Sequence, residues 1–599
     1  MLFSLSVAVG FGQTTWDFGA SPDKNWSSFT NWSTDLSPAA TAVVFGATGV
    51  TASATTVGNI VDSDYTSTNS LSSLTYSGNN TNWQVTQIDS PQTLTVAGNF
   101  TVGGLSGANQ VTKTAFTGTG SLVINNSAST VSIANTGATT ANAILDMSAL
   151  STFSATVSAF NVGTGTTGFG TLYLADNSTI TATTIKSGGS GSGYASATSN
   201  KIFLGTTTVL NTNTLSLAGD RTYGSVKFRA VGDGAANNTA VVTPTLKIRA
   251  ADGTSAAAMS VGAWTGASPA SGTSSVDLTG GTVDAKVTTL KVGTTSANST
   301  NTMNASLTID GSTSTFDASG LVTVGENTGG TSGTLGGTLN VKGGATFTAN
   351  AMTLGNQTAG ATATKGTLTV ADTNTSVTVA NNLTMGVRSG TATVTPTVTI
   401  SGGTLTVGGN LAEGTGAANI VSTVTLSGGT LDMTRGNVTV DTFNFTGGTL
   451  KNVAAFAAGT SGGLNVQNNA TLGFDNIDGA FTATTLTGTL TLGASSNLSL
   501  SLANDFTPVS GFTLIDNDGT GDSIAGTFAT VNGGAFGGGN TFTLINNTGT
   551  YNFELNYAGG DGNDLVATLS MIPEPSTYAA LLGAITLGSV VWLRSRRVN

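Results

Sequence analysis

The segment Val424–Leu450 reads VTLSGGTLDMTRGNVTVDTFNFTGGTL. In this segment apolar residues alternate with Thr, Asp and Asn, and glycines interrupt the alternation at short intervals. A period of two is typical of half-buried β-strands, and glycine supplies the positive φ that a sharp corner needs. The segment therefore predicts short strands separated by tight corners.

One phrase of this segment recurs along the chain, and a second phrase recurs in the residues before it. Gly-Gly-Thr-Leu occurs at 336–339, 402–405, 428–431 and 447–450, with a Val variant at 280–283. The second phrase, apolar-x-apolar-Gly, ends at Gly293, Gly325, Gly355, Gly386 and Gly408. A phrase that recurs every 20 to 50 residues or so is typical of a solenoid or a propeller, in which each repeat packs against its neighbours.

One repeat can be divided into three strands. Residues 366–370, 376–379 and 383–386 alternate in hydropathy, and Asn381-Asn382 provides the turn between the last two. A propeller blade would instead need four antiparallel strands and about 40 to 50 residues. We therefore predict an all-β chain that forms a right-handed parallel β-helix (a β-solenoid), with Leu and Val inside and Thr outside.

Composition limits the chemistry. Only 8% of the 599 residues are charged, the net charge is −11, and the chain has neither Cys nor His. Disulfides, thiolate ligands and imidazole chemistry are thus excluded, and no basic surface for nucleic acid is expected at a pI of about 4.4. We expect no cofactor.

The C-terminal end has three parts in a fixed order: Pro573, Glu574 and Pro575, then the uncharged stretch 576–593, then Arg594, Arg596 and Arg597. As a helix, residues 577–593 would reach roughly 26 Å, slightly less than a hydrocarbon core of about 30 Å. A single C-terminal transmembrane helix is expected, with the arginines in the cytoplasm and the rest of the chain exported.

This three-part order resembles the PEP-CTERM sorting signal of Gram-negative bacteria. The resemblance implies that an exosortase-type membrane protease recognises the Pro-Glu-Pro motif, while the inner membrane holds the chain transiently. It also implies delivery to the cell surface or to the exopolysaccharide matrix. A permanent anchor that is never cut is the alternative. Residues 1–12 are apolar and resemble the later part of a signal peptide.

The repeated phrases over about 276–450 resemble the autotransporter-associated β-strand repeat of secreted bacterial proteins, which implies the repeat architecture alone. The expected layout is a partial signal peptide (1–15), an N-terminal cap with irregular solenoid (16–275), regular repeats (276–500), a C-terminal β cap (501–570) and the sorting or anchor segment (571–599).

Three clusters could carry chemistry. Trp16, Trp26 and Trp32 would either seal the first coil or stack on sugars. The acidic residues of the C-terminal part suggest calcium, because 559–564 fits one copy of the Gly-Gly-x-Gly-x-Asp phrase of calcium-binding β-rolls, although Asp beside Gly is also ordinary turn chemistry. These calcium candidates are Asp516, Asp518, Asp522, Asp561 and Asp564.

The third cluster is a repeated basic phrase, VKFRA at 226–230 and LKIRA at 246–250. If the two strands stack in register, Lys227 lies near Lys247 and Arg229 near Arg249. Such a ladder of like charges would suit an anionic partner such as an acidic polysaccharide. Side chains staggered in solvent are the alternative.

The function expected from these features is that of a non-enzymatic, exported structural or adhesive protein associated with exopolysaccharide. The alternative is a polysaccharide-active β-helix enzyme, a lyase or a hydrolase. Such an enzyme needs several carboxylates that converge on one groove, and the repeats offer few glutamates and mostly turn-forming aspartates.

Overall fold

The computed structural model is all-β, with about 57% of residues in strands and 4% in helices, and it forms a β-solenoid of roughly 16 turns. The all-β solenoid predicted from the sequence is therefore confirmed. The structure describes residues 12–65, 70–78, 82–103, 111–134, 142–165, 168–189, 200–219, 222–265, 271–296, 300–329, 333–517, 522–571 and 577–596.

The chain divides into two compact units. Unit 1 comprises Met1–Leu431 and Thr439–Thr442, and unit 2 comprises Asp432–Val438 and Phe443–Asn599.

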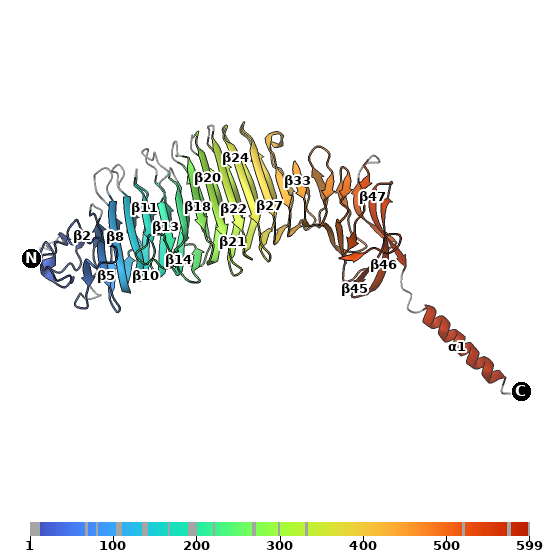
Figure 1. Ribbon diagram of the computed structural model, residues 1–599, viewed down its shortest axis with the longest axis horizontal. Helices are drawn as coiled ribbons and strands as arrows, with labels where there is room; N and C mark the ends of the chain where they lie inside the picture. Colours follow the sequence, from blue (N-terminus) through green and yellow to red (C-terminus); the bar gives the residue numbers. More distant parts are fainter. Residues whose placement is uncertain are drawn as a thin grey trace, which may run out of the picture. The chain divides into compact units, whose positions relative to one another are not determined.

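One sheet of unit 1 contains one strand from each successive turn of the solenoid, here called a coil. These strands pair in parallel and lie side by side in Figure 1. They are β18 (Gly272–Asp277), β20 (Thr302–Ile309), β22 (Thr334–Val341), β24 (Ala363–Val370), β27 (Val394–Ile400) and β30 (Thr423–Leu426). Thr302 pairs with Thr334, and Thr334 with Ala363, so one coil takes about 30 residues.

The core of these coils is a column of stacked apolar side chains. One column contains Val276, Leu307, Leu339, Leu368, Val398 and Val424, all at most 1% exposed. Fully burying one such side chain stabilises the fold by roughly 1.5–3 kcal/mol. The alternating Thr-Leu-Thr-Val pattern therefore selects which face of each strand points inward.

The remaining strands of these coils form further parallel ladders. They are β19 (Thr282–Thr295), β21 (Thr315–Asn327), β23 (Thr346–Gln357), β25 (Ser376–Val379), β26 (Leu383–Arg388), β28 (Thr404–Val407) and β29 (Leu411–Ala412). β23 pairs with both β25 and β26, so one long strand is followed by two shorter ones in the next coil. The division into three strands predicted at 366–386 is confirmed as β24, β25 and β26, and this parallel pairing rules out propeller blades.

Glycines allow the corners and the close approach of neighbouring segments. Gly293, Gly325, Gly355 and Gly386 all have positive φ, between 71° and 87°. The predicted corner at Gly336-Gly337 is wrong, because both residues lie inside β22. A Cβ at Gly337 would lie 2.3 Å from the backbone nitrogen of Gly325, so glycine here allows two backbones to touch.

The N-terminal part of unit 1 begins with β1 (Gln13–Thr15), the short 3-10 helix η1 (Phe29–Asn31) and β2 (Ala42–Phe45). The chain then continues as a stack of parallel strands. These are β3 (Asn59–Val61), β4 (Ser73–Tyr76), β5 (Gln84–Ile88), β6 (Thr93–Val96), β7 (Phe100–Val102), β8 (Val111–Asn125), β9 (Thr130–Ile133), β10 (Asn142–Val162), β11 (Gly170–Tyr173), β12 (Asn177–Ser187), β13 (Asn200–Leu204), β14 (Thr207–Leu217), β15 (Gly224–Phe228), β16 (Thr245–Arg249) and β17 (Ala257–Trp264).

Unit 2 begins with parallel ladders and ends with antiparallel strands. Its parallel strands include β34 (Gly448–Lys451), β35 (Ala455–Ala458), β37 (Ala470–Ile477), β38 (Thr484–Leu486), β40 (Asn497–Leu502) and β41 (Gly511–Asn517). β45 (Thr541–Asn546), β46 (Gly549–Gly559) and β47 (Asp564–Met571) then pair antiparallel, and β47 also covers β41. Antiparallel strands therefore occupy the region where the sequence predicts a C-terminal β cap, and they pair the edge of β41.

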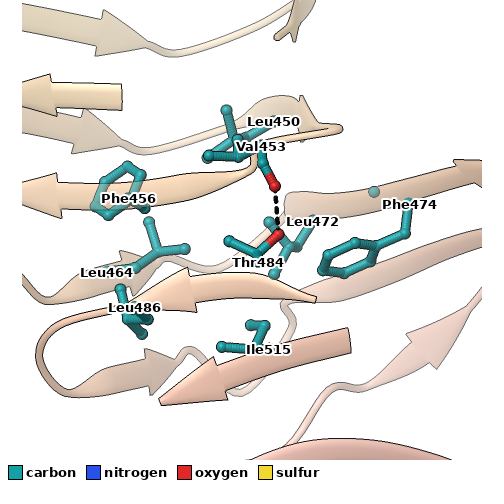
Figure 2. Close-up of a pocket in the computed structure, with 10 residues that line it drawn as sticks. Leu450, Val453, Phe456, Leu464, Leu472, Phe474, Thr484, Leu486 and Ile515 are labelled. Atoms are coloured by element: carbon teal, nitrogen blue, oxygen red, sulfur yellow. Dashed lines mark hydrogen bonds between the residues drawn. The ribbon is translucent and has the colours of Figure 1, made fainter. Parts of the chain in front are cut away.

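The interior of unit 2 is apolar and closely packed. Figure 2 shows Leu450, Phe456, Leu472, Leu486 and Ile515 around a void of only about 10 Å³. Thr484 Oγ1 lies beside them and donates to the carbonyl of Val453 (2.5 Å), so its hydroxyl is satisfied inside the core. A void of this size holds at most about one water molecule and is no ligand site.

The helix α1 (Thr577–Ser595) follows the antiparallel strands in the sequence. Among the residues that the structure describes, no helix combines the length and the hydropathy needed to cross a membrane. The helical conformation expected for this segment is present, whereas the expectation that it spans a membrane is not supported.

Candidate functional site

The outer face of the sheet from β18 to β30 carries two rows of polar side chains, here called row A and row B. Row A contains Ser275, Ser306, Thr338, Thr367, Thr397 and Thr423. Row B contains Asp277, Thr308, Asn340, Thr369, Thr399 and Thr425. Within a row, neighbours lie about 4.8 Å apart, and the two rows lie roughly 6.6 Å apart along each strand.

The regular spacing of these rows comes from the backbone. The ladders between β18, β20, β22, β24, β27 and β30 have no register shift, so each outward side chain lies beside its counterpart in the next coil. Ten of the twelve positions are Ser or Thr, and only Asp277 is charged. Rows A and B are thus ordered and polar, with a single charged side chain among their twelve positions.

Other faces of unit 1 show hydrogen bonds between side chains of successive coils. The hydroxyls of Thr282 and Thr313 lie 2.8 Å apart, and Asn381 Nδ2 donates to Asn350 Oδ1 (2.8 Å). Side chains of successive coils are therefore hydrogen-bonded to one another at these positions.

The three N-terminal tryptophans form a buried cluster. Trp16, Trp26 and Trp32 are 0% exposed, and Trp32 packs edge-to-face against both others at 5.0 and 5.2 Å. Trp26 Nε1 donates to Asn59 Oδ1 (2.8 Å), and Trp32 Nε1 donates to the carbonyl of Trp26 (2.9 Å). Of the two interpretations of the sequence, the sealing of the first coil fits this geometry, and buried rings cannot stack on an external sugar.

The two basic phrases do not form the ladder that the sequence suggested. β15 pairs with β13 and β18, whereas β16 pairs with β14 and β19, so they are successive strands in different ladders. In register, Lys227 faces Phe203 and Asp277, and Lys247 faces Val209 and Asp284. The stacking of Lys227 on Lys247 and of Arg229 on Arg249 is therefore wrong, because the phrases are only 20 residues apart and a coil is longer.

Three of these four cations have carboxylate partners. Lys227 pairs with Asp233 (2.5 Å), Arg229 with Asp176 (2.9 Å), and Arg249 Nη2 with both carboxylate oxygens of Asp284 (2.6 Å each). The two arginine side chains are only 2% and 7% exposed, so they serve the fold. Contact with a polyanion stays a prediction, with Lys227 and Lys247 as its accessible cations.

Arg229 belongs to a buried network that crosses several coils. Its Nη1 donates to the carbonyl of Ser148 (3.2 Å), and the nearby Asp146 accepts from Ser148 Oγ (2.6 Å) and from the backbone nitrogen of Ala236 (2.6 Å). Burial raises the pKa of Asp146, while these hydrogen bonds and the charge of Arg229 oppose that rise. The network attaches the segment after β15 to the side of the solenoid.

The calcium candidates that the structure describes belong to no cluster of three or more acidic side chains. Asp564 is 8% exposed, and its Oδ1 accepts from the backbone nitrogen of Asn517 (3.0 Å), whereas Asp516 and Asp561 are exposed. Asp518 lies outside the described residues. Within the described ranges, no group of three or more acidic, His or Cys side chains could hold a metal ion.

The sorting motif can be located only in part. Pro573, Glu574, Pro575 and Arg597 lie outside the described residues. Arg594 is in the last turn of α1, and the guanidinium of Arg596 lies 4.4 Å from the ring centre of Trp592.

Sequence reasoning missed a charged ladder in unit 2. Lys451 Nζ lies between Asp432 Oδ2 (3.2 Å) and Asp475 Oδ2 (2.7 Å). Asp432 and Lys451 each follow a Gly-Gly-Thr-Leu phrase directly. Their opposite charges at the same repeat position could therefore have predicted this ion pair from the sequence. Asp475 has no such phrase before it.

Comparison with known proteins gives no relative: no protein-family model, no curated protein and no solved structure matches this chain.

Proposed function

We propose that this chain is an exported cell-surface or extracellular-matrix protein with a structural or adhesive role, associated with exopolysaccharide. The observation that carries the proposal is the pair of rows A and B, in which polar side chains repeat in register over six coils. A polymer that repeats one chemical group can engage many of these positions at once, so weak single contacts add up without a deep pocket.

The rigidity of the rows supports this proposal. Thr is β-branched and has few χ1 states in a strand, and each backbone is fixed by its two neighbours. Binding would therefore immobilise little that is not already ordered, which lowers the entropy cost of each contact. The near absence of charge also means that contact with a neutral polymer would break few ion pairs.

For delivery, we propose that residues 571–599 act as a PEP-CTERM-type sorting segment. An exosortase-type membrane protease would recognise Pro573, Glu574 and Pro575 while the inner membrane holds the chain transiently, and the rest would reach the surface or matrix. The order of the motif, the helix α1 and the basic residues Arg594 and Arg596 supports this route.

Row binding can be tested with Thr-to-Val substitutions, which keep the β-branched shape and remove the hydroxyl. One variant changes Thr367, Thr369, Thr397 and Thr399, and the matched control changes Thr346, Thr348, Thr404 and Thr406 on other ladders. We expect at least ten-fold weaker binding to exopolysaccharide from the producing bacterium for the first variant alone. Equal binding by both variants and the unchanged protein would refute the proposal.

Sorting can be tested by intact-mass spectrometry of the protein from its native host, after surface and membrane fractions are separated. A mass that ends near Pro573 in the surface fraction is expected. A chain that still ends at Asn599 in the inner membrane would mean an uncut anchor.

A polysaccharide-active enzyme is the second candidate function. The observation that favours it is a carboxyl pair in unit 1: Ser422 Oγ donates to Glu413 Oε1 (2.5 Å), and Ser422 N donates to Asp441 Oδ2 (3.0 Å). Burial raises the pKa of Glu413, and Asp441 raises it further, which suits a general acid. Release of reducing ends or unsaturated sugars from bacterial and plant polysaccharides, abolished in Glu413→Gln, would establish this activity.

A further inference from the structure

Unit 2 has a surface cavity that none of the expectations from the sequence covers. Its volume is about 540 Å³, and its lining includes Asp432, Arg435, Asn452, Asp475, Asn476 and Phe481. Ligand sites in proteins commonly measure roughly 300–1,000 Å³. The cavity is therefore large enough for a small organic ligand, in contrast to the apolar void of Figure 2.

The backbone around this cavity is unusual. Thr434, Arg435, Asn452 and Asn476 line it, and all four have positive φ, of 44°, 80°, 56° and 56°. A β-branched residue such as Thr434 rarely adopts this conformation, which costs on the order of 1–3 kcal/mol. Such outliers gather at binding and catalytic sites, because the fold maintains them only where it holds side chains in a required position.

One wall of the cavity combines hydrogen-bond acceptors with donors at close spacing. Asn452 Nδ2 donates to Asp432 Oδ1 (3.0 Å) and to Asp475 Oδ2 (3.3 Å), and Lys451 lies between the same two carboxylates. The pKa of Asp475 lies below its usual value, since hydrogen bonds from Lys451 and Asn452 outweigh the opposing effect of burial. The Asp475 carboxyl is thus ionised at neutral pH, and the single cation of Lys451 faces two acidic side chains, so it compensates only part of their charge.

Arg435 and Phe481 add a cation and an aromatic ring to the lining of the cavity. The guanidinium carbon of Arg435 lies 4.8 Å from the ring centre of Phe481, and its Nη2 donates to the carbonyl of Thr482. Its Nη1 is shielded from bulk solvent and has no hydrogen-bond partner within the described chain. An unpaired buried donor is unfavourable, so an acceptor oxygen is expected beside it.

We propose that this cavity binds one or two units of a neutral saccharide. Adjacent hydroxyls of a sugar need an acceptor and a donor side by side, which the exposed amide of Asn476 supplies with its oxygen and its nitrogen. The cluster Asp432, Asp475 and Asp478 would repel an anionic ligand, and Lys451 already occupies the position that a cation would take between the carboxylates.

This inference goes beyond the proposed function, because the cavity lies in unit 2 and does not involve rows A and B of unit 1. It also differs in kind: the cavity would select a sugar by its hydroxyl pattern, whereas the rows would bind any polymer of matching repeat. The proposal for the rows and the proposal for the cavity can therefore be refuted independently.

Affinity electrophoresis of the full chain tests the proposal, with gels that contain dextran, mannan or xylan, and alginate as the anionic probe. Asn476→Gly removes a lining amide but keeps the positive φ, and Asn469→Gly is its matched control, since Asn469 is exposed, has φ 67° and is not among the lining residues. Ala480→Trp, at the exposed rim, is expected to fill the opening.

We expect retardation of the unchanged chain by at least one neutral polysaccharide, weakened at least ten-fold by Asn476→Gly and by Ala480→Trp but not by Asn469→Gly. The Thr-to-Val variant of rows A and B should keep this retardation. No retardation in any neutral gel, retardation by alginate alone, or equal retardation of all variants would overturn the proposal.

Discussion

At the residue scale, the tryptophan cluster gives the clearest prediction of stability. Trp26 is 0% exposed and contacts Trp32, Phe45 and Tyr65, so Trp26→Ala leaves a large cavity where the first coil is sealed. We expect a loss of about 3–5 kcal/mol in the free energy of unfolding. Chemical denaturation measures it, and Phe29→Ala, at a ring that is 54% exposed, should cost less than about 0.5 kcal/mol.

Arg229 gives a second prediction at this scale. Its side chain is 2% exposed, and its removal in Arg229→Met leaves Asp176 without its cation and Asp146 without a nearby positive charge. Asp176 is 44% exposed and stays hydrated, so the main cost comes from the buried Asp146 and from the lost hydrogen bond to Ser148, and a loss of about 1–3 kcal/mol is expected at neutral pH.

Lys227→Met is the control for this change, since that lysine is 40% exposed and surface pairs contribute about 0–1 kcal/mol. The two variants are compared by urea denaturation. If Arg229→Met were as stable as Lys227→Met, the buried network would have no structural role.

The raised pKa of Glu413 predicts that the stability of the fold depends on pH. Because its pKa is raised in the folded chain, the proton is held more tightly there than in the unfolded chain. Its contribution to stability is therefore present at acid pH and is lost as the pH rises through the raised value. Glu413→Gln should raise the melting temperature at neutral pH and have no effect well below the ordinary glutamate pKa.

Thermal melts across this pH range check the sign of the effect. Glu554→Gln, at an exposed position, should shift the melting temperature little at any pH. A melting temperature that falls in Glu413→Gln at neutral pH would contradict the argument.

At the scale of elements, glycine corners limit which substitutions the coils accept. Gly325 has φ 75°, and a Cβ there would lie 2.1 Å from the carbonyl oxygen of Lys365 in a neighbouring coil. Gly280 has a similar φ of 82° but open space around it. Gly280→Ala should cost about 1–2 kcal/mol from backbone strain alone, and Gly325→Ala clearly more, as measured by thermal unfolding.

The strands were predictable because alternation of apolar and polar residues is a local signal. The three strands at 366–386 were found in this way, and so was the placement of Thr on the outside of the coils. Pairing between distant segments is not local. The phrases around Lys227 and Lys247 look like neighbours in a stack, yet they are successive strands of one coil.

The cavity in unit 2 shows the same limit. The opposite charges of Asp432 and Lys451 could be read from their shared position after a repeated phrase. The positive φ of Thr434 and the approach of Arg435 to Phe481 depend on how the corners fold, and no residue pattern marks them. Glycine pairs are also ambiguous, because they serve both as corners and as points of backbone contact, as Gly336-Gly337 does.

At the scale of the whole molecule, the stack predicts tolerance to the loss of a complete coil. Since Thr334 pairs with Ala363, deletion of residues 334–362 joins equivalent register positions and places β24 where β22 was. We expect a shorter solenoid with a β-sheet circular dichroism spectrum and a cooperative melt. Deletion of residues 334–345 removes β22 alone and should abolish the cooperative melt.

The parallel stack of unit 1 also has a mechanical consequence. Each regular coil is hydrogen-bonded to the coils before and after it, so a force that pulls on the chain would act on one coil at a time. About 30 residues stretch to roughly 100 Å, whereas a folded coil occupies only about 4.8 Å of the stack. A stretching force would thus be absorbed by the release of single coils, while the remaining coils keep rows A and B in register.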